Sequence, residues 1–152
     1  MKNNKGRHYK QGVFRPLNPE KYNGTLPIIY RSGLELQYFR FLDKNPRILT
    51  WSSESIVVPY QNPLTGRVHR YFVDNSATMR DEKGSIVKYL IEIKPYSKLT
   101  PPPPSNKRKP QNTVMLQREY LQNKAKWEAA SQWSQKHGYK FIILTEKNMS
   151  NS

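Results

Sequence analysis

The chain has 152 residues, the length of a single domain, and its 26 Lys and Arg against 11 Asp and Glu give a formal net charge of +15. The longest unbroken aliphatic or aromatic run, Phe141 to Leu144, is far shorter than the ~20 residues of a membrane span, and we expect no secretory signal at the N-terminus. The absence of cysteine excludes disulfides, thiolate zinc sites and thiol nucleophiles. The surplus of positive charge predicts a polyanionic partner, with nucleic acid favoured over an anionic membrane.

The positive charge is concentrated in the flanks of the sequence. Residues 1–22 have a net charge of +5 and residues 95–112 a net charge of +4, whereas residues 23–94 hold seven of the eleven acids. Acidic groups that approach a phosphate usually need a metal ion between them and it. The central acids are therefore candidates for a metal site.

The predicted chain order is a helix, three strands, a long loop, a second helix and a last strand. Residues 1–27 show no periodic pattern and are expected to form a basic irregular arm, followed by one domain over 28–148 and a tail at 149–152. Capping residues and hydrophobic periodicity predict a helix from Ser32 to Lys44, strands over 47–60, 67–79 and 85–94, a helix over 113–137 ended by Gly138, and a strand over 139–145. The first of these strands has a possible irregularity at Ser52-Ser53. The order predicts an α/β (α+β) fold, a mixed sheet flanked by helices.

Residues 95–112 interrupt the pattern with four consecutive prolines and a basic cluster. Consecutive prolines favour an extended segment without sheet hydrogen bonds. One interpretation is a solvated linker, and the other is a mobile basic loop that closes over a phosphate backbone. The candidate nucleic-acid contacts are Arg70, which the strand pattern places on the face of Asp74, and the basic residues of the loop, Lys98, Lys107, Arg108 and Lys109.

The third predicted strand ends in a charged pair. Strand side chains alternate between faces, so Glu92 and Lys94 project together at the end of a mostly apolar strand. A hairpin about the Asp81–Gly84 turn places Asp74 opposite or beside Glu92, with the two carboxylates about 4–6 Å apart. Such carboxylates repel each other unless a cation holds them, and oxygen ligands favour Mg²⁺, Mn²⁺ or Ca²⁺.

A third acid, Glu35, has two interpretations. The spacing from Ser32 to Glu35 is that of a capping box, in which the glutamate reaches back to the start of the helix. The same residue shares a helix face with Phe39 and Leu42, which directs it toward the core and toward a site. Glu54 is a weaker candidate, because a solvent-facing strand position explains it equally well.

The acids and the element order together resemble the PD-(D/E)XK nuclease superfamily. The segments Tyr30 to Glu35, His69 to Asp74 and Ile91 to Pro95 resemble the head-completion nucleases of T-even-type tailed phages most closely, and the TnsA transposon nucleases more distantly. Val73 stands where the superfamily often has proline. The resemblance extends over residues 10–145 and implies an αβββαβ core like that of restriction endonucleases.

The resemblance also implies metal-dependent hydrolysis of phosphodiester bonds, of endo or exo type. Asp74 and Glu92 would hold Mg²⁺, with Mn²⁺ as a substitute, and the Ile93 carbonyl would be a further ligand. Glu35 would be a direct or water-mediated ligand, and Lys94 would position the attacking water. The implied substrate is double-stranded DNA.

The same resemblance implies a biological setting in the host cytoplasm during virion assembly. Cutting would finish the filled phage head before it joins the tail, with head or neck proteins as partners and neither a membrane nor a small-molecule cofactor involved. Two other hypotheses remain: a non-catalytic DNA-binding protein of virion assembly, and a basic RNA-binding protein of ribosomal type. The second is disfavoured by the acids predicted on interior strands.

Overall fold

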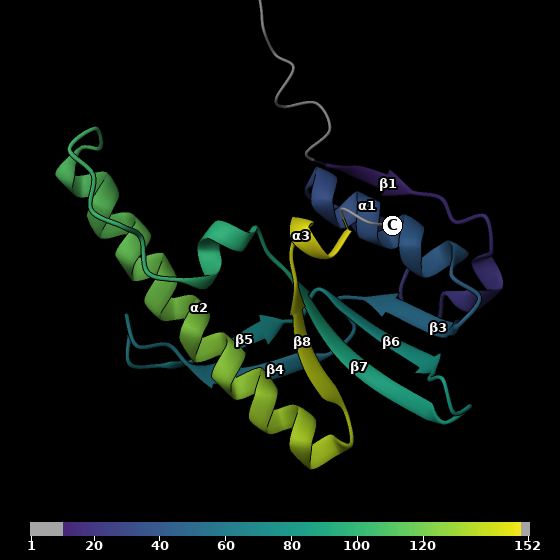
Figure 1. The fold of residues 1–152 in the computed structure, drawn as a ribbon. Coiled ribbons are helices and arrows are strands. Elements are labelled where there is room, and N and C mark those ends of the chain that lie inside the picture. The colour runs from purple at the N-terminus through teal and green to yellow at the C-terminus, as the bar shows by residue number, and fades with distance from the viewer. Residues whose placement is uncertain (1–10, 150–152) are drawn as a thin grey trace, which may run out of the picture.

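The computed structural model describes residues 11–149 and is built on a four-stranded mixed sheet (Figure 1). Its strand order is β3-β6-β7-β8, with β7 and β8 parallel and the other neighbouring strands antiparallel. These strands span Ile48–Ser53 (β3), Asn75–Arg80 (β6), Ile86–Ile93 (β7) and Lys140–Leu144 (β8). The α+β fold class predicted from the sequence, a mixed sheet flanked by helices, is confirmed.

The two faces of this sheet pack against different layers. Successive residues of β7 enter different cores: Ile91 packs with helix α1 (Gly33–Lys44), and Leu90 packs with helix α2 (Pro110–His137). This is the alternation that a strand buried on both faces produces. On the α1 side, Phe39 and Leu42 have no exposed surface. The last residues of β7 therefore lie between two packed layers.

Both long helices begin and end with recognisable capping features. The Ser32 hydroxyl accepts a hydrogen bond from the Glu35 amide at the start of α1, as the sequence predicts. Helix α2 ends at Gly138, whose φ of +78° is a left-handed conformation that glycine adopts without strain. It begins at Pro110, three residues earlier than predicted, because proline fits the first turn of a helix.

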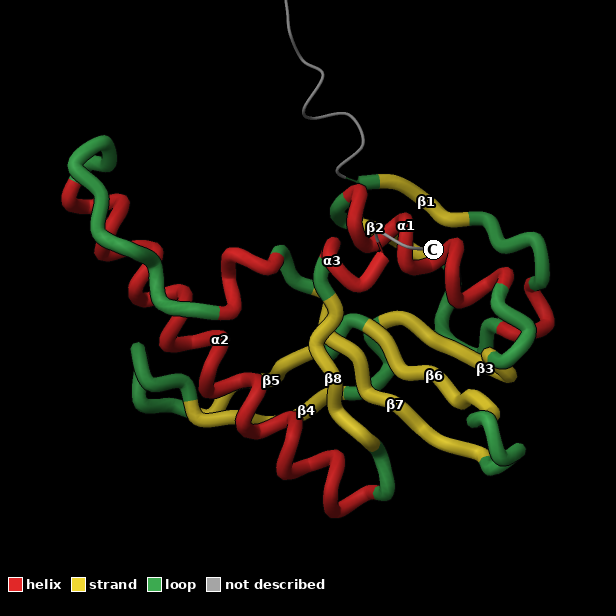
Figure 2. Tube along the Cα trace, viewed as in Figure 1, coloured by secondary structure: helices red, strands yellow, loops and turns green. Residues whose placement is uncertain are grey.

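The prediction of three long, unbroken strands between the two helices is wrong in one respect. Both the first and the second predicted strand are broken into two strands, and their inner halves form a separate two-stranded ribbon of β4 (Val57–Gln61) and β5 (Val68–Phe72). The first break lies at Glu54, whose φ of +52° turns the backbone out of the extended region. The second break lies at residues 73–74, directly before β6. The ribbon packs against α2 (Figure 2).

The N-terminal segment is more ordered than predicted within the described residues. Gly12–Phe14 (β1) pairs antiparallel with Ile28–Tyr30 (β2), and a 3₁₀ turn, η2, spans Pro19–Lys21. Phe14 is buried, with its ring 5.6 Å from Phe39 and 6.0 Å from Trp51. Residues 11–27 are thus part of the domain rather than an irregular arm, because aromatic packing holds them on α1. Residues 1–10 of the predicted arm lie outside the described residues.

A long arm projects from the domain next to the sheet (Figures 1 and 2). We define the arm as residues 96–120: the 3₁₀ turn η3 (Tyr96–Leu99), the proline-rich segment, and the first turns of α2. Its basic side chains outnumber its one acid five to one. A short helix, α3 (Glu146–Met149), follows β8. No helix in residues 11–149 has the length and apolar character needed to cross a membrane.

Candidate active site

The end of β7 brings Asp74 and Glu92 together. β6 pairs with β7 through Asn75 and Ile91, and continuing this register by one residue places Asp74 opposite Glu92. A hydrogen bond fixes the arrangement, because the Ile93 amide donates to Asp74 Oδ2 at 2.8 Å. Opposed residues on neighbouring strands point to the same face of a sheet. The hairpin register predicted from the sequence is confirmed, and the two carboxylates share one face.

The environment of Asp74 disfavours its negative charge. Burial raises the pKa of the Asp74 carboxyl well above its ordinary value, and the neighbouring Glu92 and Glu35 carboxylates raise it further. The Ile93 amide lowers this pKa by more than Glu35 raises it, and Lys94 lowers it least, but burial and Glu92 outweigh both. Glu92 is itself only 5% exposed. The strand end therefore concentrates negative charge that the protein alone does not neutralise.

Lys94 lies beside this acid pair and remains open to solvent. Its Nζ is 4.0 Å from Glu92 Oε2, and its side chain is 27% exposed against 6% for that of Glu92. A single ammonium group at this distance offsets only part of the charge of two carboxylates. Its partial exposure leaves protons of the ammonium free to contact a water molecule or a phosphoryl oxygen.

Glu35 lies at the start of α1 and combines both interpretations of its sequence position. Its Oε1 accepts a hydrogen bond from the Arg31 amide at 2.6 Å, so the glutamate reaches back past the N-cap residue Ser32. The side chain is nevertheless buried, and burial raises its pKa, with Glu54 and Glu92 adding to the rise. Glu35 therefore accepts a hydrogen bond at the start of α1 and also adds negative charge near Asp74 and Glu92.

The two roles of Glu35 predict different effects for two substitutions. Glu35→Gln keeps an oxygen for the Arg31 amide and removes the charge, so we expect unchanged or higher thermal stability without metal, together with weaker DNA cutting. Glu35→Ala also deletes the acceptor of the Arg31 amide, while the Ser32 cap remains, and is expected to cost about 1 kcal/mol of folding stability. Denaturant unfolding and a cutting assay on both variants check this. Full activity in Glu35→Gln would leave Glu35 with a capping role alone.

Tyr71 is a site residue that the sequence did not reveal. Its hydroxyl donates to Glu92 Oε1 at 2.6 Å inside the protein, which leaves Glu92 Oε2 toward Lys94. Lys126 of α2 lies over the Tyr71 ring, with Nζ 5.5 Å from the ring centroid. Tyr71 belongs to β5, so the ribbon and α2 together hold one oxygen of Glu92. A tyrosine in an amphipathic strand has core packing as its default interpretation, and nothing in the pattern distinguishes it.

Tyr71→Phe keeps the ring and deletes only the hydroxyl that holds Glu92. Glu92 would hold the metal ion that the resemblance implies, and deleting a group that orients such a ligand typically costs about 10- to 100-fold in metal affinity or activity. We expect the Mg²⁺ concentration for half-maximal cutting to rise by that factor, while the KM for DNA stays unchanged. Titrating Mg²⁺ at saturating DNA measures it. Equal Mg²⁺ dependence in the variant and the parent protein would show that Tyr71 serves packing only.

Glu54 is closer to the site than the sequence indicated. Its amide donates to the Asp74 carbonyl at 3.0 Å, and its carboxylate pairs with Arg31 at 2.5 Å. The ion pair accounts for its charge, and its left-handed backbone marks the turn where the chain leaves the main sheet. Glu54 therefore holds the backbone that precedes β6 through its amide, and its carboxylate is paired with Arg31 rather than with the acid pair.

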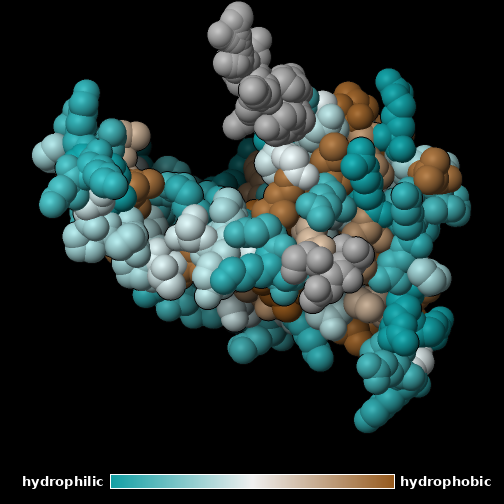
Figure 3. Space-filling view, turned by 45° about the horizontal axis from the view of Figure 1, so that its top comes forward, coloured by the Kyte–Doolittle hydropathy of each residue, from teal (hydrophilic) through white to brown (hydrophobic). Residues whose placement is uncertain are grey.

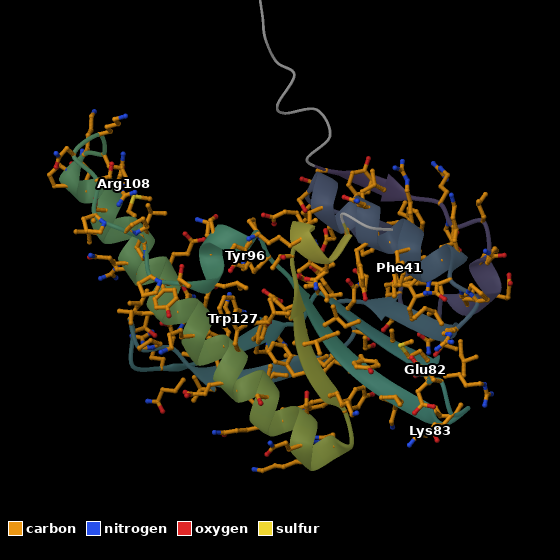
Figure 4. The ribbon with its side chains drawn as sticks, in the orientation of Figure 1. Phe41, Glu82, Lys83, Tyr96, Arg108 and Trp127 are labelled. Carbon is orange, nitrogen blue, oxygen red and sulfur yellow. The ribbon has the colours of Figure 1, made fainter. Side chains whose placement is uncertain are left out.

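The predicted nucleic-acid contacts are spread over two regions. Arg70 is exposed on β5 and packs over Phe72 at 5.2 Å, on the strand face opposite Tyr71. Its predicted place on the face of Asp74 is wrong, because the chain breaks between β5 and β6. The four basic residues predicted in the loop lie in the part of the arm that precedes α2, where Figure 4 labels Arg108. Figure 3 shows the arm standing away from the body, with a concave surface between them.

The arm residues differ in their contacts. Lys98 pairs with Glu119 at 3.0 Å, and the Arg108 guanidinium donates to Pro103 O at 2.5 Å and to Thr113 Oγ1 at 3.2 Å. Lys107 and Lys109 are exposed. The exposed pair is the more available for a phosphate backbone, because the other two cations already have partners.

The acid pair fits a hard divalent cation, although three acids do not converge. Within residues 11–149, no three His, Cys, Asp or Glu side chains lie close enough together to hold one ion. Glu35 as a direct third ligand is therefore not supported, and a water-mediated role is what the geometry leaves. The fit rests on the uncompensated charge at Asp74 and Glu92 and on an all-oxygen donor set, which suits Mg²⁺ or Mn²⁺.

Comparison with known proteins assigns the class. Residues 45–146, which include Asp74, Glu92 and Lys94, match the TnsA-like endonuclease N-terminal family. This match spans more than half of the chain, which therefore belongs to that family of endonucleases. The chain is also similar to the head completion nuclease of Enterobacteria phage T4, with 38% identity over 147 residues that cover 91% of this chain and 92% of that protein. The predicted resemblance to both groups is confirmed.

Proposed function

We propose that this chain is a Mg²⁺-dependent DNA nuclease of the PD-(D/E)XK type, in which Asp74, Glu92 and Lys94 form the catalytic centre. The observation that carries the proposal is the pairing at the end of β7. Two carboxylates share one face there, the Ile93 amide fixes Asp74, and a partly exposed lysine lies beside Glu92. A structural ion pair needs only one acid and one base, so the second acid is unexplained without a cation.

The residues of the centre have separate tasks. Asp74 and Glu92 would hold Mg²⁺ with the Ile93 carbonyl, and the bound ion would supply Lewis-acid activation of the phosphodiester and of water. Lys94 places its ammonium where it can orient the attacking water and meet the charge that develops on a phosphoryl oxygen. Glu35 holds the start of α1 against the site and contributes a further negative charge, in a water-mediated position.

The surplus positive charge supports DNA as the substrate. With a net charge of +15, the chain gains affinity for a polyanion through counterion release. The exposed Lys107 and Lys109 add positive charge to the arm. We place a duplex across the concave surface between the arm and the body, with its backbone over the end of β7.

The relative in phage T4 supports the biological setting. We propose that this chain trims or cuts DNA in the host cytoplasm, after packaging and before the head joins the tail, with head or neck proteins as its partners. The support is 38% identity along nearly the whole of both chains. Identity that spans almost the full length of two proteins is more typical of a shared task than of a shared fold alone.

The test is Mg²⁺-dependent cutting of supercoiled and linear DNA by the purified protein, beside Asp74→Ala and a matched control, Asp81→Ala. Asp81 is a half-buried acid in the β6–β7 turn, where its Oδ1 accepts hydrogen bonds from the Lys83 and Ser85 amides, far along the hairpin from the site. We expect cutting by the parent protein and by Asp81→Ala only with Mg²⁺ or Mn²⁺, and none by Asp74→Ala. DNA binding without cutting in all three proteins would favour the non-catalytic assembly role instead.

A further inference from the structure

A small pocket lies between the arm's proline-rich segment and helix α2. It encloses about 200 Å³, less than the ~300–1,000 Å³ of sites for drug-sized ligands. One wall is a helical stripe of Leu116, Glu119, Tyr120 and Asn123, and Pro102 and Pro103 form part of the opposite wall. A space of this size with an aromatic ring on one side and prolines on the other suits one flat ring system.

The pocket contains a buried polar group without a partner. Asn123 is 4% exposed, and no acceptor among residues 11–149 lies within hydrogen-bond distance of its Nδ2. Leaving a buried donor unsatisfied costs about 1–3 kcal/mol, so such groups usually have a ligand or water as partner. Because Asn123 lines the pocket, a ligand there that presents a hydrogen-bond acceptor to the wall of α2 would give this donor a partner.

The charges around the pocket favour a neutral ligand over a phosphate. Both cations that line it have partners in the protein: Lys98 pairs with Glu119, and Arg108 donates to Pro103 O and Thr113 Oγ1. The Glu119 carboxylate would repel an anion. The ligand is therefore neutral, flat and able to accept a hydrogen bond, which is the description of a nucleobase.

We infer that this pocket binds an unpaired nucleobase of the DNA, next to the bond that is cut. The inference rests on the proposed function, since it assumes that DNA lies at the end of β7. Tyr120 and the prolines would pack on the faces of the base, and the Asn123 amide would donate to an acceptor on its edge. A paired base inside a duplex has both faces covered by its neighbours, so only an unstacked base can enter.

The position of the pocket along the chain supports this role. Ser97, which lines it, follows the catalytic Lys94 by three residues, and three residues span at most about 10 Å. Successive base pairs of a duplex are about 3.4 Å apart. The pocket thus lies within about three nucleotides of the centre, close enough to read the strand that is cut.

The test measures binding to a hairpin duplex with a four-nucleotide single-stranded tail, in EDTA so that the DNA stays intact. A series of tails carries one abasic position each. Losing a stacked base costs about 1–3 kcal/mol, so we expect one tail position whose abasic form binds about 5- to 100-fold more weakly to the parent protein. Fluorescence anisotropy at fixed salt gives the dissociation constants.

Two variants and a control separate recognition from folding. Asn123→Leu deletes the unpaired donor at similar volume, so we expect its melting temperature to be maintained or raised. We call the ratio of the dissociation constants for the abasic and the intact tail the abasic contrast, and we expect this variant to lower it at least about threefold. Tyr120→Ala is expected to reduce the contrast as well. Asn112→Ala, which changes an exposed amide at the start of the same helix, should leave the contrast unchanged.

Two results would overturn the inference. One is a parent protein that binds every abasic tail as tightly as the intact tail, which would leave the pocket to a side chain of a partner protein. The other is full contrast retained in both Asn123→Leu and Tyr120→Ala. Neither result bears on Mg²⁺-dependent cutting, and a protein that shows the base contrast yet never cuts DNA would overturn only the proposed function.

Discussion

Asp74→Asn is expected to lower Mg²⁺-dependent DNA cutting by roughly a thousandfold or more. The substitution removes one of the two carboxylates that would hold the ion, and a bound metal contributes several kcal/mol to such reactions, with each 1.36 kcal/mol worth about tenfold in rate. The amide keeps an oxygen that can accept the hydrogen bond from the Ile93 amide, so the strand end should stay in place. Single-turnover cutting of linear DNA gives the rate.

The same variant has a stability signature that a mere folding defect would not produce. Because the pKa of Asp74 is raised in the folded state, the folded protein binds its proton more tightly than the unfolded chain. Stability is therefore lost as pH rises from the ordinary carboxyl pKa to the raised one. Without metal, we expect Asp74→Asn to melt higher than the parent protein at neutral pH, with the difference shrinking toward acid pH. A variant that melts lower at neutral pH would contradict this account of the site.

Lys94→Met is expected to lower the cutting rate by about 100- to 1,000-fold, the usual effect of removing one donor from a transition-state site. Methionine keeps much of the aliphatic length of Lys94 and deletes only its ammonium group. The Lys94 side chain is 27% exposed, so retaining its aliphatic part preserves its packing. Since Lys94 is not a metal ligand, the Mg²⁺ concentration for half-maximal cutting should change little. The measurement is the maximal rate across a Mg²⁺ titration.

Lys83→Met serves as the matched control for that substitution. It removes an exposed lysine from the β6–β7 turn, at the opposite end of the hairpin from the acid pair. We expect it to retain a maximal rate within about threefold of the parent protein, because neither the site nor the candidate DNA contacts include this exposed turn. Equal losses in the two variants would mean that Lys94 acts only through the overall positive charge.

Local patterns predicted the elements that position the centre. The Ser32 cap, the Asn45 end of α1 and the glycine that ends α2 are determined by neighbouring residues, so they were predictable from the sequence. The hairpin register was predictable too, because the turn before β7 fixes which residues of the two strands face each other. The juxtaposition of Asp74 and Glu92 follows from that register alone.

The separate ribbon was not predictable, because it depends on tertiary contacts. The polar residues Ser52 to Ser55 mark an irregularity in the first predicted strand, but nothing local shows that the chain leaves the main sheet there. Aromatic and β-branched residues continue as far as Val73, so the second break has no local signal before Asp74. Tyr71 was missed for the same reason, since its contact with Glu92 exists only once the ribbon lies against α2. The packing of Phe14 likewise required the position of α1.

The most direct test of the central claim is to locate the metal in crystals grown with Mn²⁺ and a DNA duplex, using anomalous diffraction. The account predicts an anomalous peak in contact with the carboxylates of Asp74 and Glu92, with Lys94 facing the nearest phosphate of the DNA. The peak should be absent from crystals of Asp74→Asn. An ion bound at any other acid, or a DNA backbone that runs away from the end of β7, would contradict the account.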